Sequence, residues 1–445
     1  MKPSAPLYHA LCAHLQKQRV SLHTPGHKHA HPIFPQDLSA LDLTELPDTD
    51  SLFEAEGAIL AAERETAQVL GVARTLFSAG GCTLCIQAML RLASMGGKRN
   101  VIAGRVLHRS AVHTMALLGL TPVWVMPRAD AGPGLPGRVH PQDVRQALLE
   151  HPDAACVYVT SPDYFGVLAD IAGIAKACQE YHVPLLVDNA HGAHLFFTSQ
   201  PHPITQGAAM TACSAHKTLP VLTGGAWLNL AGDLFLPAAK DAMALFGSTS
   251  PSYPVMASLD LCTGWLHQYA TTAYPRLEGQ VRQILERAVQ LGFGIPQGPC
   301  DPTRISLYTP PIGLTGEQTA QYLRQSGIEP EYADASYVVM IPTPCNSPQD
   351  FQRLEDALQN LPRHPALPET SCVLPPLPPA VLSVREAVLH PSVELPIAQA
   401  VGKTAACAAC PCPPGVPVVM PGEKITPSAA EFLLAYGFSR VKVLQ

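Results

Sequence analysis

Between residues 101 and 188, short apolar segments alternate with helical patterns, and this alternation limits the possible folds more than any other feature of the sequence. The apolar segments are residues 101–103, 123–126, 154–160 and 184–188. The last of them reads Pro-Leu-Leu-Val-Asp, a continuous apolar run of the kind found where helices cover both faces of a parallel sheet. The alternation therefore predicts an open α/β sheet.

Two polar segments are placed where such a sheet binds ligands, beyond the carboxyl ends of its strands. Asp188 ends the last apolar segment and is followed by Asn189-Ala190-His191-Gly192. Upstream, Gly80-Gly81-Cys82-Thr83 leads into a helical pattern. The free backbone N–H groups and positive dipole end of a helix N-terminus suit a phosphate. Glycine-rich turns before helices are common, so this turn is a weak signal by itself.

Lys217 lies in the heptapeptide Ser214-Ala215-His216-Lys217-Thr218-Leu219-Pro220, which apolar, glycine-rich sequence follows. Burial in such a setting lowers the pKa of a lysine, which is what an imine-forming amine needs. Ser214 and His216 could hold an anionic group nearby. We hypothesise that Lys217 carries pyridoxal phosphate as a Schiff base. The heptapeptide alone is equally consistent with a buried lysine paired with a carboxylate.

Two further segments each have a structural and a functional interpretation. The loop at 23–29, His-Thr-Pro-Gly-His-Lys-His, is either a polar turn or an arm that reaches toward an active site. The run at 248–253, Ser-Thr-Ser-Pro-Ser-Tyr, either caps a helix or contacts a phosphate.

Composition narrows the class of protein. Only 14% of the 445 residues are charged, against about a quarter in an average protein, so we expect an oligomer that buries surface beyond its own core. The net charge of −6 and the lack of a basic run argue against nucleic acid and anionic membranes as partners. No signal peptide or membrane span is evident, and the 13 cysteines are expected to be reduced, which predicts a cytoplasmic protein. Cys407, Cys410 and Cys412 lack a second metal-spaced pair, so no metal site is expected.

The pattern predicts five segments. They are an N-terminal segment (1–50), a large ligand-binding domain (51–270), a smaller α/β domain (271–364), a proline-rich connector (365–382) and a C-terminal domain (383–445). Within them we expect helices at 52–70, 170–181, 274–291, 316–326 and 348–361, and further strands at 304–308 and 337–341.

The order of these features is that of a fold-type I pyridoxal-phosphate enzyme, and the chain resembles the Orn/Lys/Arg decarboxylases in the shorter form without the N-terminal wing domain. The matching motifs are residues 23–28, Thr44-Glu45, Glu56-Gly57, Cys82-Thr83, His108-Arg109-Ser110, Thr160-Ser161-Pro162 with Tyr164 and Gly166-Val167, Asp188, 190–194, 214–220, 248–253, 256–260, 385–387, Gly402, 413–415 and 421–423. The resemblance implies a mostly parallel seven-stranded sheet flanked by helices, a smaller α/β domain and a C-terminal α+β domain.

The resemblance also implies roles for individual residues. Lys217 forms the Schiff base, Asp188 pairs with the pyridinium nitrogen, His108 stacks on the cofactor ring, and His191 lies near the phenolic oxygen. Residues implied to hold the phosphate are Gly81, Cys82, Thr83, Ser214 and His216, joined by Thr249, Ser250 and Ser252 from a neighbouring subunit. That arrangement implies a homodimer, with the active site at the subunit interface.

The implied reaction is decarboxylation of a basic amino acid (arginine, lysine or ornithine) to the amine used in polyamine biosynthesis. Candidates to hold the substrate are His27 and Lys28 and, for its distal cation, Glu45, Asp48, Asp50, Glu56, Glu329 and Glu331. An aminotransferase or carbon–carbon lyase is the alternative, and Arg304 would then hold the substrate α-carboxylate. A third possibility is a paralogue that binds the cofactor without turnover.

The sequence departs from the family pattern at four places. Asn189 stands where glutamate is usual, Arg109 where lysine is usual, and Cys412 where an aromatic residue is usual. The phosphate turn, usually Asn-Gly-Ser/Thr-Thr, reads Gly80-Gly81-Cys82-Thr83 and so lacks one side-chain hydroxyl. The residues implied to carry the core chemistry are retained, whereas the substrate stays open.

Overall fold

The computed structural model describes residues 16–28, 41–46, 48–369, 374–410 and 416–445. His29 of the histidine loop and Cys412 lie outside these ranges. Within them, no helix is both long enough and apolar enough to cross a membrane.

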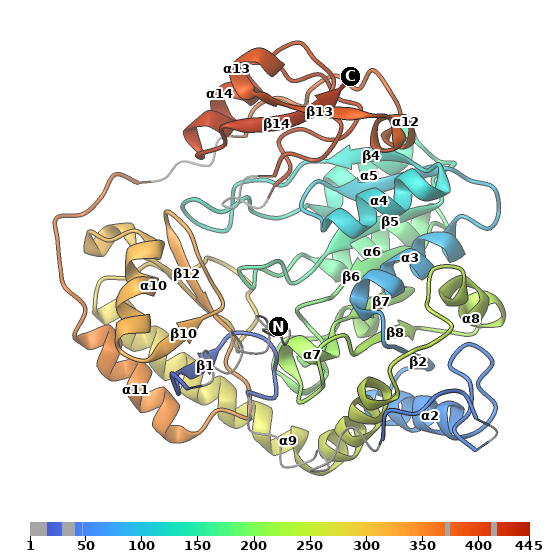
Figure 1. Cartoon of the computed structure of the whole chain (residues 1–445), viewed down its shortest axis with the longest axis horizontal. Coiled ribbons are helices and arrows are strands. Elements are labelled where there is room, and N and C mark those ends of the chain that lie inside the picture. The colour runs from blue at the N-terminus through green and yellow to red at the C-terminus, as the bar shows by residue number, and fades with distance from the viewer. Residues whose placement is uncertain (1–15, 29–40, 47, 370–373, 411–415) are drawn as a thin grey trace, which may run out of the picture.

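A seven-stranded sheet forms the centre of the largest region (Figure 1). Its strands lie in the order β2 (Arg74–Ser78), β8 (Ala226–Leu230), β7 (Met210–Cys213), β6 (Leu185–Asp188), β5 (Cys156–Thr160), β3 (Asn100–Gly104) and β4 (Thr121–Val125). Strands β3 to β7 pair in parallel, and β8 is antiparallel to both of its neighbours. The predicted mostly parallel sheet is confirmed.

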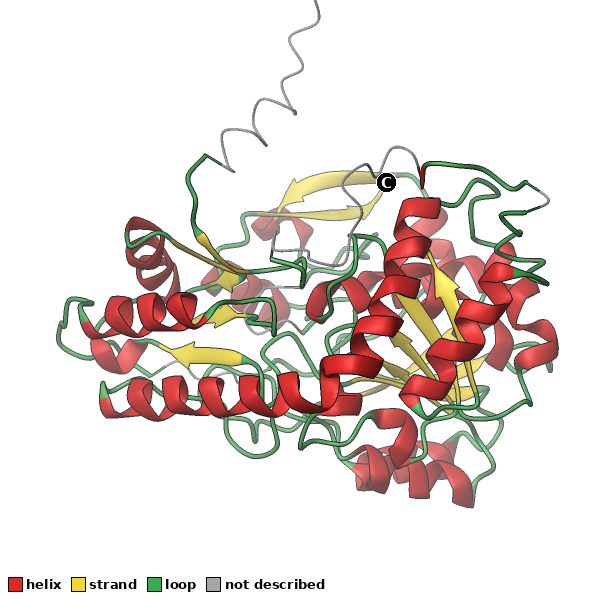
Figure 2. Cartoon of the chain, turned by 90° about the horizontal axis from the view of Figure 1, so that it is seen from below, coloured by secondary structure: helices red, strands yellow, loops and turns green. Residues whose placement is uncertain are grey.

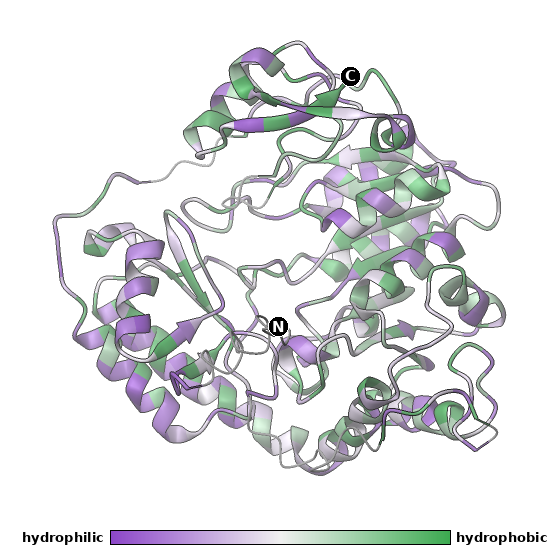
Figure 3. Ribbon diagram, in the orientation of Figure 1, coloured by the Kyte–Doolittle hydropathy of each residue, from purple (hydrophilic) through white to green (hydrophobic). Residues whose placement is uncertain are grey.

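Helices cover both faces of this sheet, which explains the continuous apolar strands (Figure 3). One face packs against α3 (Gly81–Ala93), α4 (Arg109–Leu118) and α8 (Leu236–Ala244). The other packs against α5 (Pro141–Glu150) and α6 (Ile171–Glu180). Along β5, Tyr158 belongs to the first core and Val157 and Val159 to the second, as the alternation of side chains in a strand requires.

A smaller region carries a three-stranded antiparallel sheet of β11 (Tyr332–Ala333), β12 (Tyr337–Met340) and β9 (Ile305–Tyr308). Its helices are α10 (Gly316–Gln325) and α11 (Pro348–Gln359). Near the start of the described chain, β1 (Val20–Leu22) pairs in parallel with β10 (Ile328–Pro330). The loop at 23–28 follows β1, and Glu331 follows β10. This pairing therefore fixes the loop to the small region, beside Glu331.

The C-terminal region lies beyond the β4 edge of the large sheet (Figure 1). It contains α12 (Val384–Leu389), β13 (Ser392–Pro396), α13 (Ile397–Ala400), α14 (Pro427–Ala435) and β14 (Arg440–Leu444). Arg385 of α12 donates to the carbonyl of Leu117 at the end of α4 (2.7 Å), which helps to attach this region to the large one.

Two helices differ in extent from the prediction. Helix α2 (Ala58–Leu70) begins six residues later than residue 52, because the Asp50 carboxylate accepts the N–H groups of Glu56, Gly57 and Ile59 and folds this segment into a turn. Its end at Gly71, which has a φ of 67°, is as expected.

The expected helix at 274–291 is part of a longer one, α9 (Tyr253–Gln290), which crosses between the large and small regions (Figures 1 and 2). It contains Pro275, and a proline inside a helix costs about 3 kcal/mol. Buried residues on both sides of it, among them Leu266 and Leu277, supply the packing that offsets this cost.

Candidate active site

A cavity of about 420 Å³ lies at the carboxyl ends of β5 and β6 and beside α7 (Ala215–Thr218). It opens where the switch point of an α/β sheet places ligands. Its lining residues are Gly81, Cys82, Thr83, Ile86, Val106, Leu107, His108, Thr160, Asp163, Tyr164, Asp188, Ala190, His191, Ser214, His216, Lys217 and Cys410. Nine of the twelve predicted catalytic and cofactor-binding residues are therefore in one place.

Lys217 and His191 meet in this cavity. Lys217 Nζ lies 2.9 Å from His191 Nε2. Burial lowers the pKa of Lys217, although the carboxylates of Asp188 and Glu331 partly oppose the shift. Burial lowers the pKa of His191 well below its ordinary value, and the guanidinium of Arg304 adds to the shift. The imidazole is therefore neutral, and the lysine is biased toward the free amine.

Asp188 ends β6 and is 2% exposed. Its Oδ2 accepts from the Tyr158 hydroxyl (3.1 Å) and its Oδ1 from the Ala190 N–H (3.1 Å), so the carboxylate is held rigidly. Burial raises the pKa of Asp188, and the nearby charges of Lys217 and His108 partly offset this effect. A cation placed against the carboxylate would stabilise its ionised form further.

His108 stands at the N-cap of α4 and lines the same cavity. Its Nδ1 accepts from the Ser110 N–H (3.3 Å) and lies 2.8 Å from the Ser110 hydroxyl. Burial lowers the pKa of His108, and Asp188 opposes that shift. A neutral imidazole fixed in this way can lie against a flat ring.

The glycine-rich turn that is predicted to bind the phosphate leads into α3, as the helical pattern after it indicates. Gly80 is the N-cap residue and no side chain caps this helix. The N–H of Gly81 donates to the Gly224 carbonyl (2.8 Å), which leaves the first-turn N–H groups of Cys82 and Thr83 available to an anion. Cys82 lies in this turn with 7% of its surface exposed. Burial raises the pKa of its thiol well above the ordinary value, so Cys82 adds no negative charge against a phosphate.

The hydroxyl run does not reach the Lys217 cavity within one chain. Thr249, Ser250 and Ser252 line a separate cavity of about 430 Å³, together with residues 42–45 and Tyr253. Ser252 occupies the N-cap position of α9, yet its side chain makes no capping hydrogen bond. Its suggested capping role is therefore wrong, and a contact with a neighbouring subunit stays a prediction.

Of the six acidic candidates for the substrate's distal cation, Glu331 comes closest to the cavity wall. It accepts from the hydroxyl of Tyr164 (3.0 Å), which lines the cavity, and from the N–H of Thr24 (2.8 Å). Glu329 instead pairs with Arg19 and Arg324, and Glu45 accepts from Ser51. Asp50 organises the turn before α2, and Asp48 and Glu56 are exposed and do not line the cavity.

The histidine loop lies behind this wall rather than in it. Lys28 is 8% exposed and donates to the carbonyl of His23, and neither His27 nor Lys28 lines the cavity. Burial lowers the pKa of Lys28 to about 7, with Glu331 opposing the shift. Direct substrate contact by these two residues remains a prediction.

The unusual Asn189 has a structural function. It is fully buried, its Nδ2 donates to the Ser161 carbonyl (2.6 Å), and its Oδ1 accepts from the Cys213 thiol (3.3 Å). These bonds tie together the ends of β5, β6 and β7, and the side chain does not line the cavity. Asn189 is therefore a structural residue outside the cavity wall.

Sequence reasoning missed four residues at the site: Tyr158, Asp163, Arg304 in contact with His191, and Cys410 as part of the wall. Asp163 follows β5 as Asp188 follows β6, so the strand-end rule would have found it. Its Oδ1 accepts from the N–H groups of Phe165 and Val167, and burial raises its pKa to about 6. Cys410 comes from the C-terminal region, and no local pattern connects it to Lys217.

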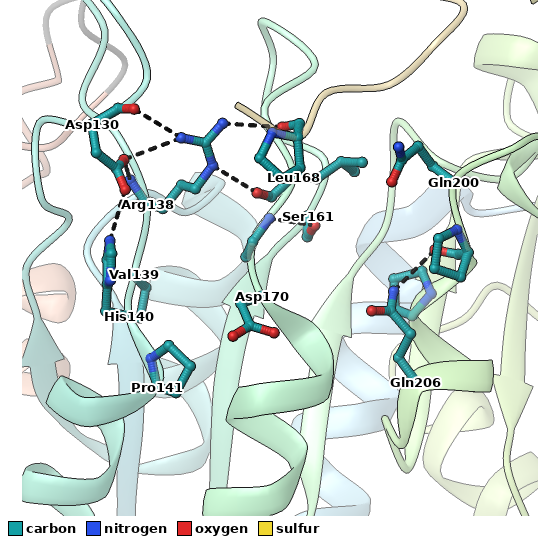
Figure 4. Close-up of a pocket in the computed structure, with 14 residues that line it drawn as sticks. Asp130, Arg138, Val139, His140, Pro141, Ser161, Leu168, Asp170, Gln200 and Gln206 are labelled. Atoms are coloured by element: carbon teal, nitrogen blue, oxygen red, sulfur yellow. Dashed lines mark hydrogen bonds and ion pairs between the residues drawn. The ribbon is translucent and has the colours of Figure 1, made fainter. Parts of the chain in front are cut away.

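A second cavity, of about 460 Å³, is lined by Asp130, Arg138, His140 and Ser161, among others (Figure 4). Its Arg138 guanidinium donates to Asp130 and to the carbonyls of Leu168, Gln297 and Pro299. His140 also lies 2.7 Å from Asp130. These groups already satisfy one another and join the large region to the loop at 297–299, so they form a structural contact.

The sheet and the cavity define a fold-type I pyridoxal-phosphate fold. The structure is similar to lysine decarboxylase A from Pseudomonas aeruginosa, with a TM-score of 0.76 and 18% identity over 99% of this chain and 80% of that chain. It is also similar to alanine–glyoxylate aminotransferase from Nostoc sp., with a TM-score of 0.59 and 16% identity over 77% of this chain and 94% of that chain.

The chain belongs to the Orn/Lys/Arg decarboxylase family. Residues 5–274 match the model of the family's major domain, and residues 377–439 match the model of its C-terminal domain. The chain is 30% identical to the arginine decarboxylase of Bacillus subtilis strain 168 over 458 residues, covering 95% of this chain and 91% of that protein. The predicted family, fold class and enzyme class are confirmed.

Proposed function

We propose that the chain decarboxylates a basic amino acid with pyridoxal phosphate held as a Schiff base on Lys217. The observation that carries the proposal is that Lys217, Asp188, His108 and the uncapped N-terminus of α3 line one cavity. Each offers a different partner for one cofactor: an amine for its aldehyde, a carboxylate for its ring nitrogen, an imidazole for its ring face and N–H groups for its phosphate.

The cavity fits this cofactor chemically. The buried Asp188 carboxylate has an unfavourable desolvation energy that a pyridinium N–H would relieve. The first-turn N–H groups of α3, with Ser214 and His216 beside them in the lining, suit a dianionic phosphate. When bound, pyridoxal phosphate supplies the electron sink for decarboxylation.

Each side chain is proposed to have a separate role. Lys217, as a free amine, would hold the aldehyde of the cofactor. Asp188 keeps the ring nitrogen protonated, and His108 holds the ring in place. Lys217 or His191 returns a proton to the substrate Cα after CO2 has left, because the two nitrogens lie 2.9 Å apart and face the same cavity.

Glu331 is the residue that we propose to bind the substrate's distal cation. Its carboxylate lies directly behind the cavity-lining Tyr164, and its negative charge acts on Lys217 and His216. Arginine is the first substrate to test, since relatives named arginine decarboxylase share 28–30% identity and those named lysine decarboxylase 20–23%.

Transamination on the same site is less well supported. That reaction would need Arg304 to receive a substrate carboxylate, yet the Arg304 side chain is 1% exposed, whereas Glu331 is only partly buried. The Arg304 guanidinium contacts the Tyr164 carbonyl and His191 instead.

The test is to incubate the chain with arginine, lysine and ornithine, each labelled at the carboxyl carbon, and to measure trapped CO2 and the amine product. We expect one of the three to give both products in equal amounts. Lys217→Ala should abolish turnover and the absorbance of the Schiff base, whereas Lys176→Ala, on the exposed face of α6, should change neither. Keto acid without CO2 would contradict the proposal.

A homodimer is also proposed, because the exposed hydroxyls of Thr249, Ser250 and Ser252 do not line the Lys217 cavity of their own chain and could reach that of a neighbouring subunit. Sedimentation of the chain tests for the dimer. A second experiment mixes the Lys217→Ala variant with a variant in which Thr249, Ser250 and Ser252 are all alanine, and recovery of activity would show that sites are shared between subunits.

A further inference from the structure

The two ring nitrogens of His191 face different partners. Nε2 lies 2.9 Å from Lys217 Nζ, and Nδ1 lies 3.4 Å from an Nη atom of Arg304. The imidazole therefore bridges the amine that is proposed to hold the cofactor and a guanidinium outside the cavity.

The chemistry of the guanidinium fixes the direction of these hydrogen bonds. Arginine is always protonated in proteins and has no acceptor atom, so His191 Nδ1 must be the acceptor. A neutral imidazole carries one proton, which is then on Nε2. With its proton on Nε2, the ring can donate to Lys217 Nζ only if that nitrogen is a neutral amine, whereas an ammonium on Lys217 would donate to Nε2 and require the opposite tautomer. The opposite tautomer would direct Nδ1–H against the N–H of Arg304.

Arg304 is itself held from three sides. Its Nη1 donates to the Tyr164 carbonyl (3.1 Å), and its Nη2 lies 3.7 Å from Asp301 Oδ2. His194 and the arginine lower the pKa of Asp301 to about 2, although burial opposes the shift, so this carboxylate is ionised. Gly166 leaves room for the side chain, since a Cβ there would lie 2.7 Å from Arg304 Cγ.

We propose that Arg304 is a positioning residue that holds His191 as the Nε2–H tautomer and thereby presents Lys217 as a neutral amine. The inference rests on the proposed role of Lys217, but the tautomer is a property of the chain without substrate. It also gives Arg304 a function other than binding of a substrate carboxylate, which the 1% exposure of its side chain disfavours.

The test is ¹⁵N NMR of the full chain labelled at its histidine nitrogens, measured without the cofactor and again after its addition. The ¹⁵N signals that are missing from the spectrum of the His191→Asn variant are assigned to the His191 ring. We expect the Nδ1 signal of His191 at the position of an unprotonated nitrogen and the Nε2 signal at that of a protonated one. A proton on Nδ1 in the unmodified chain would overturn the inference, and this result needs no variant to fold.

Variants then separate positioning from general stability. Arg304→Met should convert the single-tautomer pattern into a mixture, and Arg304→Lys, which keeps a cationic donor, should restore it. Arg324→Met, which removes an arginine exposed beside Glu329, should leave the pattern unchanged. An unaltered pattern in a folded Arg304→Met chain would also overturn the inference. Failure to release CO2 from any amino acid would instead contradict the proposed function and leave the tautomer result standing.

Discussion

Arg105 and Glu423 form a two-point ion pair, 2.7 Å at each contact, between the end of β3 and the C-terminal region. The two side chains are 0% and 3% exposed. Arg105 also donates to the carbonyls of Pro417 (2.8 Å) and Val418 (3.2 Å). Because Cys410 of the same region lines the Lys217 cavity, this buried contact holds one wall of the site in place.

Glu423→Gln should loosen the C-terminal region. The change leaves the Arg105 guanidinium buried without its counter-charge, and breaking a buried pair in this way costs about 3–5 kcal/mol. Hydrogen exchange of residues 416–445 should speed up accordingly. The matched control is Glu394→Gln, which removes the exposed pair with Arg440 in the same region and should cost about 1 kcal/mol or less. Equal effects of the two changes would show that the buried pair does not hold the region.

Asp188→Asn should slow decarboxylation more than it weakens cofactor binding. The amide keeps the shape of the side chain but cannot hold the ring nitrogen protonated, and loss of one preorganised electrostatic partner costs about 10²–10³ in kcat. Single-turnover CO2 release measures the rate, and titration with pyridoxal phosphate measures binding. Asp233→Asn, at an exposed aspartate paired with Arg74, is the control. A parallel loss of binding and rate would contradict the assigned role.

Glu331→Gln should raise KM for the basic amino acid by about 10- to 100-fold, the effect of losing a hydrogen bond to a charged group. The smaller change should be in kcat, because Glu331 lies behind Tyr164 and away from the reacting atoms. Glu329→Gln is the matched control two residues away, since its carboxylate is already paired with Arg19 and Arg324. If the control raises KM as much, Glu331 is not the specific partner.

The sheet and the centre of the site follow from local sequence. The run at 184–187 is apolar because helices cover β6 on both faces, and Asp188 is polar because it is the last residue of the strand, at the carboxyl edge of the sheet. The same rule brings Asp188 and Lys217 together, since β6 and β7 are neighbours and end at the same edge. Each of these features depends on a few consecutive residues.

Contacts between distant segments could not be predicted in this way. Glu331 was one of six acidic candidates, and it is distinguished by Tyr164, which lies 167 residues away in the chain. Arg304 reaches His191 across 113 residues, and Cys410 reaches the cavity from the C-terminal region. The late start of α2 likewise depends on one carboxylate, Asp50, and the helical pattern alone does not contain that information.

Lys28→Met should remove a pH dependence of stability. Burial lowers the pKa of Lys28 from 10.5 to about 7, so between these values the unfolded chain binds more protons than the folded one. Stability of the unmodified chain therefore rises with pH across this window, and below pH 7 the buried charge carries its full cost. Denaturant unfolding at several pH values should show the variant's advantage shrinking as the pH rises from 7 to about 10. A constant difference would mean that Lys28 does not titrate in this range.

Gly166→Ala should disturb the site through Arg304. Gly166 has a φ of +90°, which an alanine adopts only with strain of about 1–3 kcal/mol. The new Cβ would also lie 2.7 Å from Arg304 Cγ and 2.8 Å from its Cβ, so the arginine must move. We expect lower stability together with loss of the single tautomer of His191 in the ¹⁵N spectrum.

The control for this change is Gly264→Ala in the middle of α9, where a Cβ would meet nothing within 4 Å. There the substitution should stabilise the chain by about 0.5–1 kcal/mol, because alanine loses less backbone freedom in a helix than glycine does. If Gly166→Ala lowers stability but leaves the His191 signals unchanged, the glycine is needed only for the backbone conformation of its own turn. If both change, the space beside Gly166 is what keeps Arg304 against His191.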